Sequence, residues 1–263
     1  MTSGAEVAPQ HGEPLHGEPA PDGTVPRETG RAVQRQTGST VPRETGTSVQ
    51  RKLDDEAAET AARAAADAVF GARRGLADAY ARHLATTGVD HGLLGPREAG
   101  RLWSRHLVNS AVVAELVPPG ARVLDVGSGA GLPGLPLAIA RPDVTVVLVA
   151  PLLRRTTWLL DVVADLQLDV EVVRARAEEL HGSRRADVVT SRAVAPLDRL
   201  ARWCLPLVAP GGQMLAIKGR GAATELTSTA STLRRLGAGA TDVVRCGMAY
   251  PGAGATVVRV KRG

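Results

Sequence analysis

A short glycine-rich segment holds the residues whose types and spacing most clearly indicate chemistry. Residues 125–131 read Asp-Val-Gly-Ser-Gly-Ala-Gly and follow a β-branched run near 122–126. Glycine permits positive φ angles and lets a ligand approach the backbone closely. Ligands of open α/β sheets bind beyond the carboxyl ends of the strands, at turns of this kind. The segment therefore predicts a nucleotide-like ligand seated on a turn that contains Gly127 and Gly129.

The glycine spacing fits more than one interpretation. Gly129, Gly131 and Gly134 satisfy the dinucleotide pattern G-x-G-x-x-G, and an ordinary strand-to-helix turn also uses such glycines. Asp125, which leads into the turn, favours S-adenosylmethionine, because a site that accommodates a pyrophosphate needs no comparable acid. We expect S-adenosylmethionine as the cofactor, with a nucleotide-dependent oxidoreductase as an alternative.

A carboxylate that usually accompanies such a turn is absent from its expected place. Either cofactor is normally held by an acid about 20 residues further on, at the end of the second strand, where it accepts hydrogen bonds from the ribose. Ala150 occupies that position, and the nearest acid, Asp143, precedes the strand. Because a charge-assisted hydrogen bond contributes roughly 1.5–3 kcal/mol, we expect weaker cofactor binding. A non-catalytic or weakly active RNA-binding paralogue remains a further alternative.

The elements that must position this turn follow from alternating patterns beyond Gly120. Short β-branched runs alternate with helical windows, which is typical of a parallel sheet with crossover helices. We expect an α/β fold of the Rossmann-like class I methyltransferase type, with a seven-stranded, mostly parallel sheet, a C-terminal antiparallel hairpin and N-terminal helices. Strands are predicted near 122–126, 144–149, 170–173, 187–190 and 213–217, helices near 133–141, 153–166, 195–207 and 222–236, and the hairpin at 241–248 and 254–261.

The amino-terminal part has a different composition. Residues 1–52 are rich in Pro, Gly, Thr and Gln, and the run Thr-Val-Pro-Arg-Glu-Thr-Gly occurs at 24–30 and again at 40–46. Such a segment buries too little apolar surface to offset its ordering entropy, so we expect a disordered tail. Residues 53–119 are expected to form a helical region packed on the core, with helices over 54–87 and from Pro96 to about Leu116. Residues 120–263 are then the cofactor-binding core.

Composition sets limits on the environment and partners. The net charge is +5, and since the chain has only three lysines this charge comes almost wholly from arginine, which suits a polyanionic partner or reflects compositional bias. Cys204 and Cys246 match no metal or redox spacing, and only His11 and His16 are closely spaced histidines, so no metal site is expected. No signal peptide or apolar run of membrane length is visible, and we expect a cytoplasmic protein.

Several blocks outside the turn resemble one known family. The chain is similar, over roughly residues 75–225, to the bacterial 16S rRNA guanine-N7 methyltransferases called RsmG or GidB. The matching blocks are Arg-Leu-Trp-Ser-Arg-His-Leu-Val-Asn-Ser at 101–110, Leu-Pro-Gly at 132–134, Pro-Leu-Leu-Arg-Arg-Thr-Thr at 151–157, Arg-Ala-Glu-Glu at 176–179, Thr-Ser-Arg-Ala-Val-Ala-Pro-Leu at 190–197 and Ala-Ile-Lys-Gly at 216–219.

The resemblance implies roles for particular residues. Gly127 and Leu132 are expected to contact the cofactor at the turn, Ala177 and Glu178 to flank its adenine, and Arg192 to lie at the junction of cofactor and substrate. The family usually shows Glu or Asp where this chain has Ala150. The implied reaction moves a methyl group to N7 of a guanine in 16S rRNA or the small ribosomal subunit, by a chain that we expect to be a monomer. Because the N7 lone pair is free without deprotonation, no catalytic proton-transfer residue is assigned, and catalysis would rest on proximity.

Five residues are expected on the substrate side. Arg154 and Arg155 fall in the first turn of a predicted helix, where cations oppose the macrodipole, so we expect a functional reason for them. Together with Lys218 and the arginine at the junction, they are predicted to face RNA phosphates or the cofactor carboxylate. His106 and Asn109 are three residues apart, on one helical face directed towards the carboxyl edge of the sheet. Helix capping or core packing is an alternative role for His106.

Overall fold

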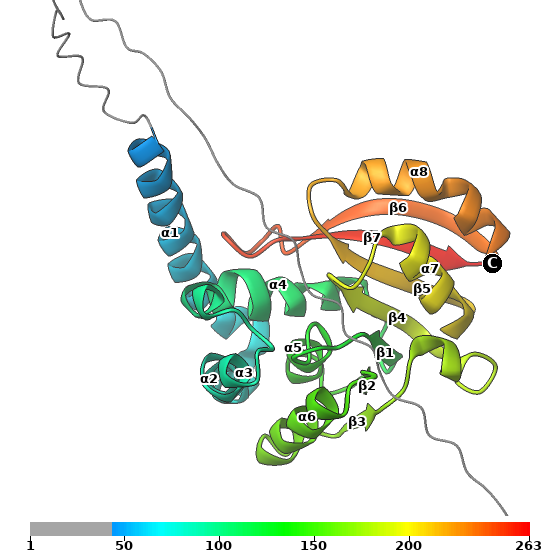
Figure 1. Ribbon diagram of the computed structural model, residues 1–263, viewed down its shortest axis with the longest axis horizontal. Helices are drawn as coiled ribbons and strands as arrows, with labels where there is room; N and C mark the ends of the chain where they lie inside the picture. The colour runs from blue at the N-terminus through cyan, green and yellow to red at the C-terminus, as the bar shows by residue number, and fades with distance from the viewer. Residues whose placement is uncertain (1–43) are drawn as a thin grey trace, which may run out of the picture. The chain divides into compact units, whose positions relative to one another are not determined.

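Seven strands form one sheet in the carboxyl-terminal part of the chain (Figure 1). The computed structural model describes residues 44–263, with side chains from Ser48 onward. The strand order is β3-β2-β1-β4-β5-β7-β6; β1 to β5 are parallel, and β7 runs antiparallel to both β5 and β6. This topology confirms the predicted class I fold with its C-terminal hairpin. The strands are β1 (Arg122–Val126), β2 (Thr145–Val149), β3 (Val170–Val173), β4 (Ala186–Arg192), β5 (Val208–Lys218), β6 (Ala238–Cys246) and β7 (Ala255–Arg262).

Helices cover both faces of the sheet, and the side chains on both sides of the strands are therefore buried. In β1, Val123 packs with one apolar cluster and Leu124 with the other. Figure 1 shows the corresponding layers, with α7 and α8 on the opposite face from α5 and α6. All four helices occupy windows predicted from the sequence. Their bounds are α5 (Gly134–Ala140), α6 (Leu153–Asp165), α7 (Leu197–Cys204) and α8 (Ala222–Arg235), with short 3₁₀ segments η5 (Ala177–Leu180) and η6 (Leu205–Leu207).

The first helices differ in their bounds from the expected ones. Helix α1 (Glu44–Phe70) begins eight residues before the boundary predicted at residue 52, so residues 44–52 are helical and not part of a disordered tail. The prediction for residues 1–43 lies outside the described residues. Gly71, with a φ of 51°, separates α1 from the next turn, as expected for a residue that tolerates positive φ. The bounds that follow are η1 (Gly71–Arg73), α2 (Arg74–Ala85) and α3 (Thr87–Asp90).

The helix predicted from Pro96 to Leu116 is present, but its pitch changes along its length. It consists of η2 (Pro96–Arg101, 3₁₀), η3 (Trp103–Leu107, π-helical), α4 (Val108–Ala111) and η4 (Val112–Leu116, 3₁₀). Where η3 begins, the buried carboxylate of Glu59 accepts hydrogen bonds from the backbone N–H groups of Trp103 (3.0 Å) and Ser104 (2.9 Å). Short π-helical turns of this kind occur frequently at functional sites.

The helical region and the sheet pack into one compact unit. The fully buried Tyr80 of α2 donates a 2.6 Å hydrogen bond to the carbonyl of Ala130, and Trp158 of α6 donates one of 2.9 Å to the hydroxyl of Thr87. Between the described ends of the chain, no helix is long and apolar enough to cross a membrane.

Candidate cofactor and substrate site

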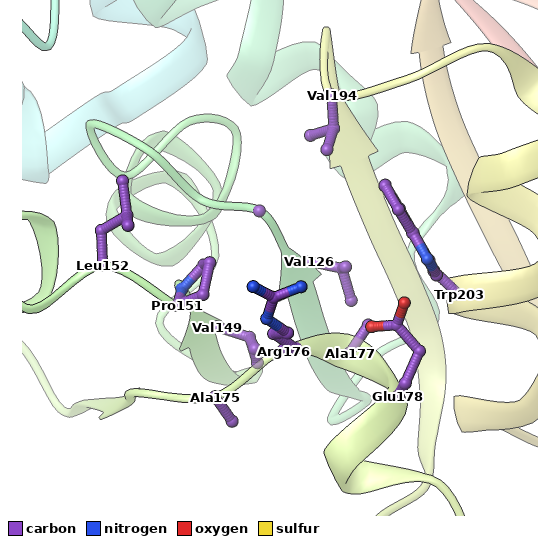
Figure 2. Close-up of a pocket in the computed structure, with 11 residues that line it drawn as sticks. Val126, Val149, Pro151, Leu152, Ala175, Arg176, Ala177, Glu178, Val194 and Trp203 are labelled. Atoms are coloured by element: carbon purple, nitrogen blue, oxygen red, sulfur yellow. The ribbon is translucent and has the colours of Figure 1, made fainter.

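A cleft of about 320 Å³ opens at the carboxyl ends of β1 and β2 (Figure 2). Its walls come from the ends of these two strands, the segment after β3, the loop after β4 and Trp203 of α7. Figure 2 shows Glu178 and Trp203 next to each other on one wall, with Pro151 and Leu152 on the other side. The cleft therefore lies where the glycine turn predicted a ligand.

The glycine turn forms part of this cleft and is held by its own backbone. Gly127, Gly129 and Gly131 have φ angles of 76°, 58° and 88°, which L-residues with a side chain rarely adopt. The N–H groups of Gly127 and Ser128 both donate to the carbonyl of Val149, at 2.9 and 3.1 Å. The end of β1 is thus tied to the end of β2, and the floor of the cleft is fixed by short-range contacts.

Asp125 lies beneath the turn and does not line the cleft. Its side chain is fully buried, and Oδ2 accepts a 2.9 Å hydrogen bond from the N–H of Gly134 at the start of α5. Oδ1 has no hydrogen-bond partner among the described residues. Burial raises the pKa of Asp125 to about 7, although the bonds from Gly134 and Ser128 and the charge of Arg192 lower it. This acid anchors a helix, a role that the sequence argument for the cofactor did not anticipate.

Three of the six predicted cofactor residues line the cleft. Gly127, Ala177 and Glu178 are on its surface, whereas Gly129 lies within the turn and Leu132 is buried behind it. The sixth, Arg192, stands at the end of β4, in the strand that leads into the loop carrying Val194. The contacts of Arg192 extend to the helical region.

Ala150 contributes no surface to the cleft. It is 1% exposed and packs with Leu148 on the other face of β2, and its N–H donates to the carbonyl of Val173 at 3.1 Å. Within the described part of the chain, Glu178 supplies the one carboxylate of the cleft wall. A nucleoside hydroxyl or amine in this cleft therefore has Glu178 as its acidic partner.

Sequence reasoning missed two walls of the cleft. Val194 follows Arg192 in the loop after β4, and its Cγ2 atom lies 2.7 Å from where a Cβ on Gly127 would stand. Trp203 of α7 forms the wall beside Glu178. Both residues lie more than 60 positions beyond the glycine turn, and no local sequence pattern predicts their contact with the cleft.

Arg192 is held by side chains from the helical region. Its Nη2 atom lies 2.6 Å from Nδ1 of His106, and its Nη1 donates to the hydroxyl of the buried Ser110 at 3.0 Å. On the other side of the imidazole, Nε2 of His106 lies 2.9 Å from a carboxylate oxygen of Glu98. Burial, followed by the charge of Arg192, lowers the pKa of His106 to about 4, so the imidazole is neutral at pH 7.

Asn109 also lies at the carboxyl edge of the sheet, but it contacts a different segment from the one that His106 contacts. Its amide donates to the carbonyl of Gly254 at 2.8 Å, in the turn between β6 and β7. Since β6 runs parallel to β5, this turn lies at the carboxyl edge. The helical stretch therefore directs both His106 and Asn109 towards that edge, and their predicted contacts with substrate stay a prediction.

Lys218 is engaged within the protein. Its ammonium donates to the carbonyl of Ala195 and to the carboxylate of Glu225, both at 2.8 Å, and its side chain is 10% exposed. Glu225 also accepts a 3.0 Å bond from the N–H of Leu197. The pair stabilises the loop after β4, in which Ala193 has a φ of 52°, a strained angle for a residue with a side chain.

Arg154 and Arg155 lie in the first turn of α6, as predicted. Arg154 is exposed beside Leu152, and Arg155 is half-buried, with a buried Nε that has no partner among the described residues. Both cations thus remain available for an anionic ligand next to the cleft. Among the residues that the structure describes, no three His, Cys, Asp or Glu side chains group as a metal site would require.

Comparison with known proteins decides which family this site belongs to. The sequence pattern of the family described as rRNA small subunit methyltransferase G matches residues 74–250, which include the cleft, Arg192 and the helical stretch with His106. This chain belongs to the rRNA small subunit methyltransferase G family. The family resemblance noted in the sequence is thereby confirmed, and the oxidoreductase and non-catalytic alternatives are not favoured.

Members of the rRNA small subunit methyltransferase G family are similar to this chain over most of their length. The one from Rhodococcus jostii is 54% identical over 210 residues, which cover 79% of this chain and 92% of that protein. The one from Salinispora arenicola is 56% identical, covering 75% and 85% of the two chains. The one from Mycobacterium leprae is 58% identical, covering 74% and 81%.

Proposed function

We propose that this chain transfers a methyl group from S-adenosylmethionine to N7 of a guanine in 16S rRNA. The observation that carries the proposal is the cleft at the carboxyl ends of β1 and β2, bounded by a glycine turn, in a member of the rRNA small subunit methyltransferase G family. Relatives that bear this name share more than half of their aligned residues with the chain.

The residues of the cleft fit the cofactor. Its volume of about 320 Å³ lies within the usual range of small-molecule sites. A side chain on Gly127 would collide with Val194, so the turn and the loop after β4 can approach this closely only around a glycine. Ala177 and Glu178 would hold the adenosine, and Arg192 would bind either the carboxylate of the cofactor or a phosphate of the RNA. The cofactor supplies an electrophilic methyl group.

Methyl transfer to N7 requires the protein to orient the guanine and the cofactor and to bind RNA phosphates with positive charge. It requires no proton transfer. The N7 lone pair of guanine is available at neutral pH, so bringing it in line with the methyl group is the main requirement. Arg154 and Arg155, exposed and half-buried beside the cleft, would bind phosphates of the RNA. The neutral His106 and the buried Asp125 hold other groups in place and need not exchange a proton.

The same proposal extends to partners and location. The substrate would be 16S rRNA or the small ribosomal subunit, and access to it supports a cytoplasmic location. We propose that it acts there as a monomer.

The direct test uses the purified protein, small ribosomal subunits or free 16S rRNA, and S-adenosylmethionine with an isotope-labelled methyl group. Nucleosides from the digested RNA are then separated and identified by mass spectrometry. The proposal predicts label in N7-methylguanosine. Label in another nucleoside would disprove the assigned position, and an unlabelled RNA in the presence of bound cofactor would disprove the activity.

A further inference from the structure

Three side chains from three separate segments form a line that ends at Arg192. Glu98 lies in η2, His106 in the π-helical η3 and Arg192 at the end of β4. The imidazole stands between the other two, with Nε2 at 2.9 Å from Glu98 and Nδ1 at 2.6 Å from Nη2 of Arg192. His106 is 7% exposed, so water does not compete strongly for either contact.

The donors and acceptors in this line determine the tautomer of His106. A guanidinium nitrogen can only donate, so Nδ1 must accept and carry no proton. The single ring proton is then on Nε2 and is donated to the carboxylate of Glu98. The other carboxylate oxygen of Glu98 accepts from Arg101 at 2.9 Å, which keeps Glu98 in position. Each contact therefore requires the next, as in other sites where a carboxylate orients a histidine.

The line leaves one edge of the Arg192 guanidinium without a partner. Arginine has five N–H donors in a fixed planar fork. Nη1 and one N–H of Nη2 are used by Ser110 and His106. Nε–H and the second N–H of Nη2 have no partner among the described residues. These two donors together match the two oxygens of a carboxylate or a phosphate.

The fold shows why the contact is available. The change to π-helical pitch over Trp103–Leu107 directs His106 towards β4, and the buried carboxylate of Glu59 stabilises the beginning of that segment. Ser110, fully buried one turn further, contacts the same guanidinium. Four residues of the helical region thus combine to hold one cation at the end of β4, the strand that leads into the loop carrying Val194 of the cleft wall.

We propose that His106 is a positioning residue: its Nδ1 acceptor, fixed by Glu98, holds Arg192 so that the free edge of the guanidinium binds an oxyanion at the junction of cofactor and RNA. This inference rests on the proposed function, since the oxyanion is either the carboxylate of the cofactor or a phosphate of the rRNA. Its first premise, the tautomer of His106, is a property of the protein alone.

The test compares two substitutions of nearly equal size. His106→Asn places an amide oxygen close to the position of Nδ1, whereas His106→Gln places its amide near Nε2 and removes the acceptor for Arg192. Thr87→Val is the control, because it also breaks one side-chain contact between the helical region and the core, the part-buried 2.9 Å bond with Trp158, and does not touch Arg192. Calorimetry measures the affinity for S-adenosylhomocysteine and, separately, for a 16S rRNA fragment.

The proposal predicts that His106→Gln weakens one of the two affinities by about 10- to 100-fold, the usual effect of a lost hydrogen bond to a charged group. His106→Asn should stay within about threefold of the wild type by the same scale. Loss of S-adenosylhomocysteine binding identifies the carboxylate as the ligand, and loss of RNA binding identifies a phosphate. Equal affinities in all variants, or equal losses in the Asn and Gln variants, would overturn the proposal. Thr87→Val should change only the melting temperature.

A second measurement separates this proposal from the proposed function. Nitrogen NMR of the imidazole in the free wild-type protein should show an unprotonated Nδ1 and a protonated Nε2 at pH 7. If the wild type bound no S-adenosylhomocysteine, the proposed cofactor would fail while the NMR signature still tested His106. A protonated Nδ1 in the wild type would overturn the role of His106, whatever the protein binds.

Discussion

The glycine turn and the loop after β4 meet at the same cleft but are stabilised in different ways. The turn is held by its own backbone, through the N–H groups of Gly127 and Ser128 and the carbonyl of Val149 on the neighbouring strand. The loop is held by side chains from distant segments, with His106 holding Arg192 at its start and Lys218 bound to Ala195. One side of the cleft is therefore held by backbone hydrogen bonds to the adjacent strand, and the other is held by side chains from distant segments.

Because of this difference, substitutions at the turn and substitutions around the loop should affect different properties, the stability of the fold and the binding of ligands. Changes at the turn should unfold the protein together with its site, since the turn packs directly on the core. Changes around the loop should leave the fold and alter binding, since long side chains can be replaced without displacing a strand. The following predictions test that contrast, beginning with the largest effect.

Gly134→Val is the change expected to be most destabilising. A Cβ on Gly134 would stand 2.3 Å from Cδ2 of Leu148 and 2.8 Å from Oδ2 of Asp125. Neither neighbour has room to move in the packed core, so we expect a loss of more than about 4 kcal/mol in the free energy of unfolding. Gly75→Val is the control, since a Cβ on Gly75 meets no atom within 4 Å. Urea denaturation of both variants measures the difference; similar unfolding midpoints would contradict the close packing of the turn.

Asp125 makes the turn sensitive to pH. Its pKa is about 7 in the folded protein, against 3.8 for the unperturbed group. Between these values the folded state binds a proton that the unfolded state has released, so stability falls as pH rises, by up to about 1.4 kcal/mol per pH unit. Asp125→Asn should remove this part of the pH dependence and make the protein more stable than the wild type near pH 8. Denaturation curves at pH 5, 6, 7 and 8 test this, and parallel pH profiles of the two proteins would refute it.

Glu178 should affect cofactor binding and not stability. It is exposed on the wall of the cleft and is the carboxylate available there for the adenosine. Glu178→Gln keeps the shape and removes the charge, and we expect S-adenosylhomocysteine to bind about 10- to 100-fold more weakly. Asp198→Asn, an equally conservative change at an exposed acid of α7, is the control. Should both variants bind like the wild type, Glu178 does not hold the cofactor.

The cations near the cleft should divide into two groups. Replacing Arg154 and Arg155 together by Ala should lower the slope of RNA affinity against salt concentration by up to about 2, because each phosphate contact contributes about 0.9. Lys218→Met should leave the slope unchanged, because its charge is already paired with Glu225, and should lower stability by about 1–3 kcal/mol. An unchanged slope for the double variant would show that Arg154 and Arg155 do not contact phosphates. A lower slope for Lys218→Met would show that Lys218 does.

The side of the cleft formed by the glycine turn was predictable from the sequence. The glycines and the β-branched runs fix strand, turn and helix within about 20 residues, and the observed bounds of β1 are the predicted ones. The family resemblance also identified the positions of Ala177 and Glu178, which do line the cleft. Periodicity and turn residues involve neighbouring positions, so they can be recognised from the sequence without knowledge of the fold.

The side of the cleft formed by the loop after β4 was not predictable in the same way. Lys218 was expected to face phosphates, and its pairing with Glu225 becomes visible only when β5 and α8 are in place. The π-helical segment that carries His106 begins at backbone N–H groups bound by Glu59, 47 residues before His106 in the chain. Asp125 served in the sequence only as a pattern that favours S-adenosylmethionine, and its hydrogen bond to the start of α5 becomes visible only in the fold. Contacts between distant side chains leave no periodic signal.

The most direct test of the account is to map N7-methylguanine in small-subunit rRNA from cells with and without this protein. Reduction and strand cleavage at N7-methylguanine, followed by primer extension, locates the modified base. The account predicts one cleavage site in 16S rRNA that disappears when the protein is absent and returns when it is expressed again. An identical cleavage pattern with and without the protein would contradict it.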